Sequence, residues 1–150
     1  MQGALLIAAR GYAAPEVGQA YTRARELCQQ VSQTPQLFQA LWGLYAFHCM
    51  RAELETARAL DGQLSTLVPS LSDPMLLTEA YLAIGSTAFY TGEFERAYEQ
   101  MSRGVSLLPS PQAYSLTQSA QDPWVFCLGF EAWTLPLLGY PEQARERLDP

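Results

Sequence analysis

Residues 75–109 read MLLTEAYLAIGSTAFYTGEFERAYEQMSRGVSLLP and decide the fold of this 150-residue chain. The first half is apolar on most sides, whereas in the second half Phe94, Ala97 and Met101 recur at spacings of three and four. Such spacing is typical of one face of an α-helix. The turn residues YTGE at 90–93 join the halves, and glycine there permits a sharp reversal. The stretch therefore predicts two antiparallel helices.

The same order of elements recurs along the chain: an apolar helix, a tight turn, an amphipathic helix and a proline-marked loop. One alanine marks each amphipathic helix, at Ala20, Ala57, Ala97 and Ala144. No stretch alternates as a strand between hairpin turns. The pattern predicts an all-α fold in which antiparallel helix pairs stack as an α-solenoid. We expect one helical-repeat domain over residues 1–150, with about three and a half pairs at 1–33, 35–71, 73–110 and 122–150.

Proline residues mark where the helices begin. Pro15 is followed by an acid, Thr34 precedes a proline as a predicted N-cap, and Asp73 and Asp122 do the same. A capping side chain followed by proline is typical of a first helical turn. The polar residues 110–121 are predicted to form a loop.

Composition excludes several classes of function. The net charge is −6, and all nine basic residues are arginines scattered along the chain, which disfavours nucleic acid binding. The apolar stretch 124–140 is shorter than a membrane span and contains Glu131 and Pro136, so no membrane partner is expected. No basic region precedes the apolar start, which makes a secretory signal improbable. We therefore predict a cytoplasmic protein with reduced thiols at Cys28, Cys49 and Cys127.

The stretch 75–109 resembles the tetratricopeptide repeat family, whose repeat has about 34 residues. With Thr78 as the first position, small and large residues fall where that repeat expects them. The matching residues are Tyr81, Ile84, Gly85, Ala88, Gly92, Phe94, Ala97, Met101, Gly104 and Pro109. The other copies match less well, because Tyr45 occupies a small position and Ala52 the turn position. The resemblance implies that Gly85 and Ala97 allow close helix packing.

A wider resemblance covers nearly the whole chain. Phrases such as GYAAPEVGQAYTRARELCQQ, TPQLFQALWGLYAF and QDPWVFCLGFEAWTLPLLGYPEQA are similar to the helical-repeat region of large bacterial ATPase regulators. In that family the region follows a P-loop signalling ATPase, often with a class III adenylate or guanylate cyclase domain. The chain has no lysine and hence no P-loop motif. The resemblance implies a fragment of such a regulator, with any ATPase or cyclase activity outside these residues.

Residues with catalytic potential are sparse. His48 is the single histidine, and its neighbour Cys49 points about 100° away on a helix, so a packed or hydrogen-bonded histidine is expected. No spacing suits a metal site, and no cofactor is expected. We predict that this segment is not an enzyme. The alternative, a small enzyme, would need a pocket with perturbed ionisable groups around His48 or Glu131.

A partner-binding groove is expected along the first helix of each pair, where tetratricopeptide proteins hold peptides. Aromatic side chains suit such a surface, although aromatic stripes at helical spacing also build cores. Basic residues that clamp a carboxylate are absent, so the ligand should be apolar or cationic. The predicted groove residues are Gln39, Trp42, Ala46, Glu79, Leu82, Ser86, Phe89, Tyr90 and Trp133.

The sequence thus favours a protein-interaction or sensor scaffold in a signalling ATPase, which binds a protein, a peptide or neighbouring domains of its parent. The alternative is a structural spacer without a ligand. The chain begins and ends inside repeats without polar capping helices, so we also expect self-association through these ends or marginal stability of the isolated segment.

Overall fold

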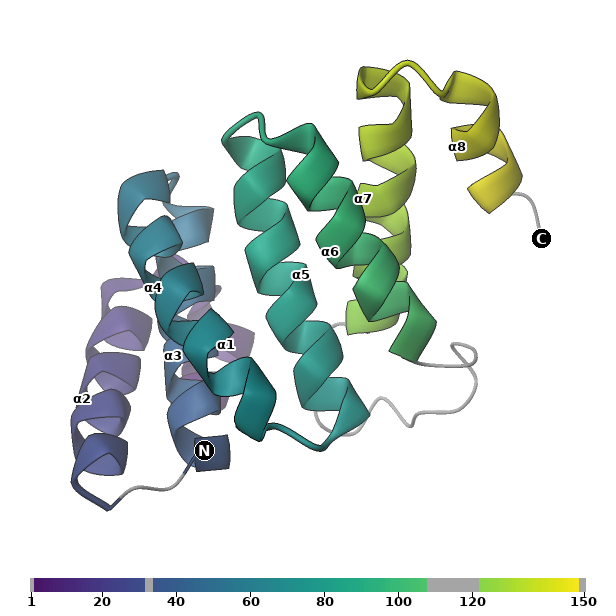
Figure 1. Ribbon diagram of the computed structural model, residues 1–150. Helices are drawn as coiled ribbons and strands as arrows, with labels where there is room; N and C mark the ends of the chain where they lie inside the picture. The colour runs from purple at the N-terminus through teal and green to yellow at the C-terminus, as the bar shows by residue number, and fades with distance from the viewer. Residues whose placement is uncertain (1, 32–33, 108–121, 149–150) are drawn as a thin grey trace. The chain divides into compact units, whose positions relative to one another are not determined.

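A computed structural model describes residues 2–31, 34–107 and 122–148, which contain eight α-helices, one 3-10 helix and no strand (Figure 1). The all-α prediction is therefore confirmed for the described residues. The chain divides into two compact units, which we call the N-terminal unit (Met1–Leu71) and the C-terminal unit (Ser72–Pro150). The boundary falls between two of the predicted helix pairs.

The N-terminal unit contains α1 (Gln2–Arg10), α2 (Pro15–Val31), α3 (Thr34–Met50), α4 (Leu54–Leu67) and the 3-10 turn Val68–Ser70. Helix α2 packs against α1 and α3, and α3 also packs against α4. The apolar α3 is covered on several sides, as its composition predicts. The buried residues that fill this unit include Val17, Phe38, Leu41, Leu44, Ala57, Leu60 and Leu64.

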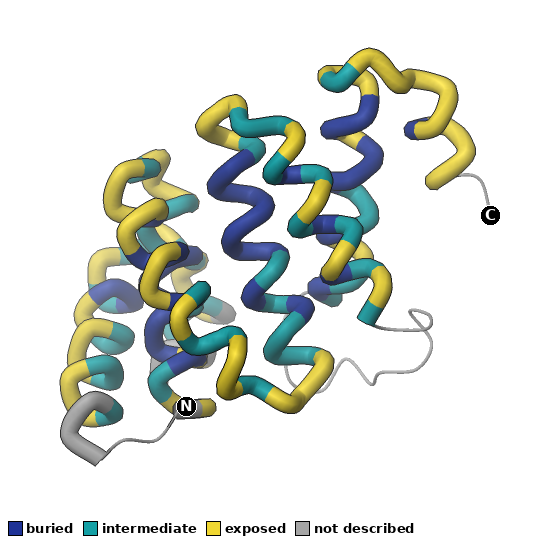
Figure 2. The backbone as a smooth tube through the Cα atoms, viewed as in Figure 1, coloured by how far each residue is buried: buried dark blue, intermediate teal, exposed yellow. Residues whose placement is uncertain are grey.

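The C-terminal unit contains α5 (Pro74–Tyr90), α6 (Phe94–Leu107), α7 (Pro123–Leu137) and α8 (Pro141–Leu148). Helix α5 packs against both α6 and α7, and α7 also packs against α6 and α8. Figure 2 shows α5 buried along most of its length and α8 mostly exposed. The first helices of two successive pairs, α5 and α7, thus lie side by side. The predicted loop 110–121 falls outside the described residues.

Two of the predicted N-caps are confirmed. The Asp73 carboxylate accepts a hydrogen bond from the backbone N–H of Met75 at 2.9 Å. The Asp122 carboxylate accepts one from the N–H of Trp124 at 2.9 Å. Helix α3 begins at Thr34 itself, so Thr34 is the first helical residue and not the predicted N-cap, and the predicted start at Pro35 is one residue late.

Each tight turn contains one residue in the left-handed conformation. Its φ is 81° at Gly11, 58° at Ala52, 81° at Gly92 and 91° at Gly139. In three of these turns the N–H of the following residue reaches back across the helix end; Glu93, for example, donates to the Ala88 carbonyl at 2.8 Å. This arrangement satisfies carbonyl groups that a helix end otherwise leaves open. Ala52 is the one of these four residues that is not glycine, so it lacks the conformational freedom of glycine. Its place in the repeat predicts that it lies at the turn.

Ala52→Gly should therefore stabilise the chain by roughly 0.5–1 kcal/mol, because the side chain no longer opposes a positive φ. Urea denaturation followed by circular dichroism measures the change. The matched control is Ala59→Gly at an exposed position inside α4, which should destabilise by about 1 kcal/mol. Equal effects of the two substitutions would refute this account of the turn.

Glycines inside the helices mark places of close approach. A Cβ at Gly85 would lie 2.8 Å from the Met101 side chain of α6, in agreement with the predicted small position. A Cβ at Gly43 would lie 2.3 Å from the Tyr21 ring of α2. The Tyr21 ring is rigid, whereas the Met101 side chain is flexible and can move aside. An added methyl group should therefore be tolerated less well at Gly43 than at Gly85.

Gly43→Ala should destabilise the chain by roughly 1–3 kcal/mol, since the Tyr21 ring or the α2 backbone must shift. Gly62→Ala is the matched control, because Gly62 also lies within a helix and has no atom within 4 Å of an added Cβ. That control should stabilise by about 0.5–1 kcal/mol through helix propensity. Thermal unfolding of both variants measures whether each substitution lowers or raises the stability. A neutral Gly43→Ala would show that the helices are not in tight contact there.

Candidate functional site

An aromatic cluster lies where α5 and α7 pack together in the C-terminal unit. The Phe130 ring of α7 is central, with its centroid 5.3 Å from that of Phe89, 5.8 Å from Tyr90 and 5.3 Å from Trp133. All three pairs are edge-to-face, an arrangement that aromatic quadrupoles favour. Phe130 is only 6% exposed, whereas Tyr90 is 46% and Trp133 is 60% exposed. Two exposed rings thus rest on one buried ring.

Local sequence places these rings in three helices. Phe89 and Tyr90 end α5, and Phe130 and Trp133 are three residues apart on α7, a spacing that puts them on one face. The turn at Gly92 brings the chain back so that Phe94, the first residue of α6, lies 5.9 Å from Phe89. The cluster therefore depends on the helix turn as well as on the pairing of α5 with α7.

Helix α7 extends this cluster into an apolar stripe. Phe126 precedes Phe130 by one turn and is 38% exposed, while Leu137 follows Trp133 by one turn and is 53% exposed. Residues at these spacings share one face of a helix. We call Tyr90, Phe126, Phe130, Trp133 and Leu137 the aromatic surface.

The single charged residue of α7 lies fully buried, away from this stripe. Glu131 Oε1 accepts a hydrogen bond from the Ser102 hydroxyl at 2.5 Å and pairs with Arg147 of α8 at 3.2 Å. Its other oxygen, Oε2, is buried without a hydrogen-bond partner among the described residues. The exposed stripe of α7 therefore carries no charge of its own.

The six predicted groove residues of the C-terminal unit lie in different environments in the structure. Phe89, Tyr90 and Trp133 come together through Phe130. Leu82 is buried in the core with Met101, Cys127 and Phe130, and Ser86 is buried with its hydroxyl donated to the Leu82 carbonyl at 2.6 Å. Glu79 is half-buried near the start of α5.

The three predicted groove residues of the N-terminal unit lie on α3. Gln39 is exposed, and Ala46 is 7% exposed. Trp42 is half-buried and meets the Tyr12 ring edge-on at 6.4 Å. In this unit the predicted face is thus a packed surface with one exposed amide.

Sequence reasoning missed the residue that joins the aromatic cluster. Phe130 precedes Trp133 by three residues, and Phe89 precedes the turn glycine Gly92 by the same number. The first spacing puts both rings on one helical face and was a usable signal. The contact of Phe130 with α5 had no local signal, because it joins residues about 40 positions apart.

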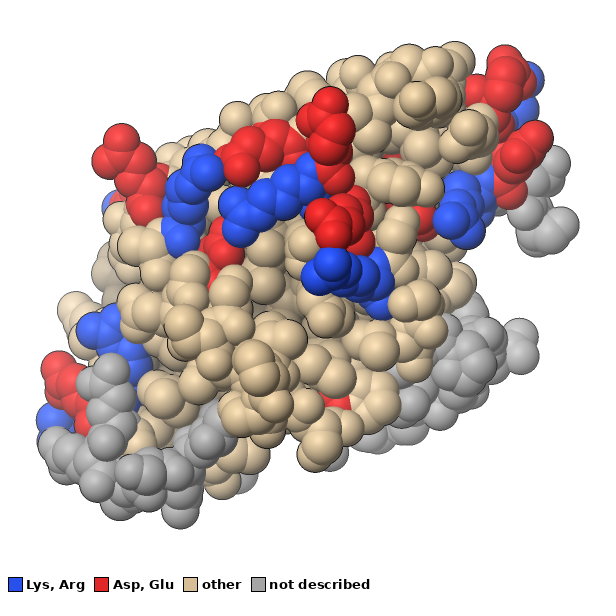
Figure 3. Space-filling model, viewed as in Figure 1, with Lys and Arg blue, Asp and Glu red and all other residues tan. Residues whose placement is uncertain are grey.

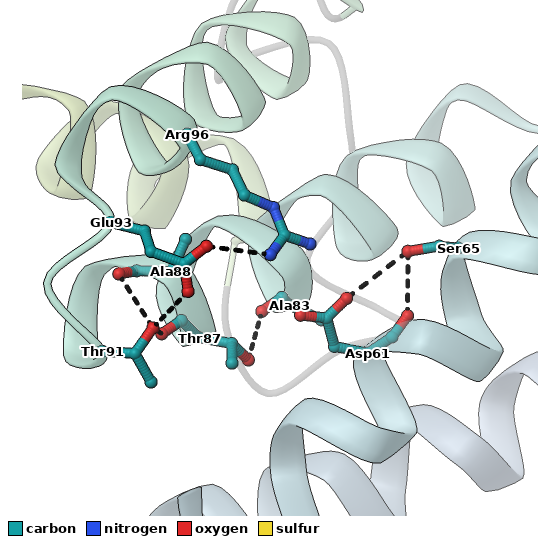
Figure 4. A network of polar contacts seen from close by, with 8 residues as sticks. All are labelled: Asp61, Ser65, Ala83, Thr87, Ala88, Thr91, Glu93 and Arg96. Atoms are coloured by element: carbon teal, nitrogen blue, oxygen red, sulfur yellow. Dashed lines mark hydrogen bonds and ion pairs between the residues drawn. The ribbon is translucent and has the colours of Figure 1, made fainter. Parts of the chain in front are cut away.

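Hydroxyl groups near the α5–α6 turn are engaged by nearby backbone and side chains (Figure 4). Thr87 donates to the Ala83 carbonyl at 3.1 Å, and Thr91 donates to the Thr87 carbonyl at 2.9 Å. The Thr91 hydroxyl oxygen also lies 3.0 Å from the Glu93 carboxylate, as an alternative acceptor for its one proton, and that carboxylate accepts a hydrogen bond from Arg96 at 3.3 Å. These bonds satisfy the hydroxyl groups close to the helix end.

The Ser65 hydroxyl of the N-terminal unit, which bonds to Asp61, shows the same local pattern (Figure 4). The Ser65 hydroxyl donates to the Asp61 backbone carbonyl at 2.9 Å, a bond within α4. Such back-bonding satisfies the hydroxyl inside its own helix.

A cavity of about 550 Å³ opens in the N-terminal unit between α2 and the end of α3. His48 Nδ1 lies 2.6 Å from a Glu53 oxygen, and Arg51 Nε donates to the other oxygen at 2.7 Å. These hydrogen bonds, that of His48 first, hold the pKa of Glu53 below its usual range. The prediction of a hydrogen-bonded histidine is confirmed. Leu44 and Phe47 supply the apolar part of the wall.

The polar part of the cavity wall is formed mainly by charged and imidazole side chains, which are Arg23, Glu26, His48, Arg51 and Glu53. Thr22 is the one hydroxyl residue on its wall, and neither serine nor cysteine lines it among the described residues. Within the described ranges no group of three or more histidine, cysteine or acidic residues could hold a metal ion. The bonds of His48 and Arg51 to Glu53 connect the end of α3 to the residue that precedes α4.

Comparison with protein-family models and with curated proteins returned no match. None of the helices in the described ranges has the length and apolar character needed to cross a membrane.

Glu79 gives the C-terminal unit a predictable pH dependence. Burial, with a smaller contribution from Asp73, raises the pKa of Glu79 to about 7. The folded state then binds a proton that the unfolded state has lost, so stability falls as pH rises from about 4.5 to about 7 and is level above that. The slope is at most about 1.4 kcal/mol per pH unit. Glu79→Gln should flatten this part of the profile, as urea denaturation across pH 5–8.5 can measure. Parallel profiles of the two proteins would contradict the assignment.

Proposed function

We propose that this chain is a helical-repeat interaction and sensor segment of a multidomain signalling ATPase, and that the aromatic surface holds a protein or peptide. The observation that carries the proposal is the exposure of Tyr90 and Trp133 on a buried ring, because such anchored aromatic side chains dominate binding energy at interfaces. The side-by-side packing of α5 and α7 supports a stack of helix pairs of the tetratricopeptide type.

The link to a signalling ATPase rests on sequence resemblance. In this proposal the partner is a protein segment, from another chain or from a neighbouring domain of the parent regulator, in the cytoplasm. Any nucleotide chemistry belongs to domains outside this chain. The competing proposal, a spacer repeat without a ligand, requires the exposed rings to have no partner.

Pull-down with the purified chain separates these proposals. Tyr90→Ala combined with Trp133→Ala should reduce capture of the bound protein at least about tenfold, because truncation of central aromatic anchors typically costs more than 1.4 kcal/mol each. Both side chains are exposed, so the fold should survive, and circular dichroism verifies it.

The matched control is Leu27→Ala, since Leu27 is 47% exposed on α2 of the N-terminal unit. It should leave capture unchanged. Equal capture by the wild type and the double variant would remove the aromatic surface from the proposal and favour the spacer.

A further inference from the structure

We infer that the cavity of the N-terminal unit binds a small organic acid, whose carboxylate pairs with Arg51 while its apolar body lies against Phe47 and Leu44. This site goes beyond the proposed function, because it uses the other unit of the chain and a ligand of another class. The cavity measures about 550 Å³, and small-molecule sites in proteins typically enclose roughly 300–1,000 Å³. Its size therefore suits a small molecule.

The apolar part of the cavity wall lies where α2 and α3 approach closely. A Cβ at Gly18 would lie 2.8 Å from the Phe47 ring, so the missing side chain lets this ring lie against the α2 backbone. Leu44 precedes Phe47 by three residues, a spacing that puts both side chains on one face of α3. The Phe47 ring is only half-buried. An apolar ligand body that covers it removes apolar surface from water, which favours binding.

Arg51 is held in one orientation beside this apolar wall. Its Nε donates to Glu53 Oε1 at 2.7 Å, and its Cζ lies 5.4 Å from the centroid of the Phe47 ring. The other Glu53 oxygen lies 2.6 Å from His48 Nδ1, so the carboxylate that holds Arg51 is itself fixed from two sides. The guanidinium group is therefore oriented before a ligand arrives, and less side-chain entropy is lost on binding.

The remaining N–H groups of Arg51 offer a site for an acceptor. A guanidinium group has five N–H donors, of which the bond to Glu53 uses one. Among the residues that the structure describes, none accepts a hydrogen bond from the Nη groups of Arg51, whereas both oxygens of Glu53 are engaged. The edge formed by the two Nη groups matches the two oxygens of a carboxylate. The ligand should therefore bring a carboxylate to this edge.

The charge around the cavity favours a ligand with one negative charge. Residues 1–71 contain five arginines and five acidic residues, so the net charge of −6 comes entirely from residues 72–150. The second arginine of the wall, Arg23, is paired with Glu26 at 3.0 Å. On the face drawn in Figure 3, basic and acidic side chains likewise lie next to one another and form no continuous basic patch. A single guanidinium edge suits a carboxylate better than a doubly charged phosphate.

The test uses the full chain and follows the imidazole C–H signals in ¹H–¹³C spectra at constant pH. His48 is the single histidine, so these signals belong to a residue of the cavity wall. Phenylacetate should shift them with a Kd roughly in the millimolar range or below, as expected for a ligand of this size. Phenylacetamide has the same ring without the charge and should bind at least about fivefold more weakly. Acetate has the charge without the ring and should also bind at least about fivefold more weakly.

Substitutions assign the binding to Arg51. Arg51→Gln removes the guanidinium group and should weaken phenylacetate binding at least about fivefold, while circular dichroism verifies the fold. Arg51→Lys keeps the charge but loses the planar edge, so its Kd should lie between those of the wild type and Arg51→Gln. The matched control is Arg103→Gln, because Arg103 is likewise exposed and paired with a glutamate but belongs to the C-terminal unit. It should leave the Kd unchanged.

Several results would overturn the inference. Equal affinity for phenylacetate and phenylacetamide would show that the cavity does not select a charge, and equal affinity for acetate would remove the apolar contact. Phenylacetate binding that is unchanged in both Arg51 variants would place the carboxylate elsewhere. No shift with phenylacetate at millimolar concentrations would show that the cavity does not bind this class of ligand. Tighter binding of the tripeptide Ala-Ala-Phe with a free carboxylate would identify a chain end as the occupant instead. None of these results involves the aromatic surface, so the pull-down alone decides the proposed function.

Discussion

The left-handed residue at each helix turn is the constraint on which the helix pairs depend. At Gly92 the positive φ lets Glu93 bond back to the Ala88 carbonyl, and α6 begins at the next residue. With so short a connection, the second helix must return antiparallel along the first. The return also places Phe94 against Phe89, so the aromatic cluster begins at the turn. Ala52 accepts the same conformation without the freedom of glycine.

Small residues decide how closely the helices of the C-terminal unit approach. A Cβ at Gly104 would lie 2.7 Å from Cys127 Sγ, so α6 and α7 meet at that glycine. Burial, and secondarily the charge of Glu131, raises the pKa of the Cys127 thiol to about 12, and the side chain packs as an apolar group. Glu131 is a costly group to bury, and its bonds to Ser102 and Arg147 fix which side of α7 faces α6 and α8. The opposite, uncharged side is thereby left for the aromatic surface.

The candidate site was predictable in part. Repeat register identified Phe89, Tyr90 and Trp133, which the structure brings together, because helical spacing determines the face on which a residue lies. Register did not separate these residues from Leu82 and Ser86, which are buried. Burial depends on what packs against a face, and one helix's periodicity contains no record of its neighbours. A pocket around His48 was named only as the requirement of the enzyme alternative, and the structure does place a cavity beside His48.

The sequence by itself determined the all-α fold and the starts of α2, α5 and α7, because proline and capping aspartates act on the backbone within a few residues of themselves. Asp73 and Asp122 cap the helices that they were expected to cap. Only the tertiary structure decided that Phe130 supports Tyr90 and Trp133. That contact joins α5 to α7 across about 40 residues, and it arises from the fit of two helix surfaces rather than from any local preference.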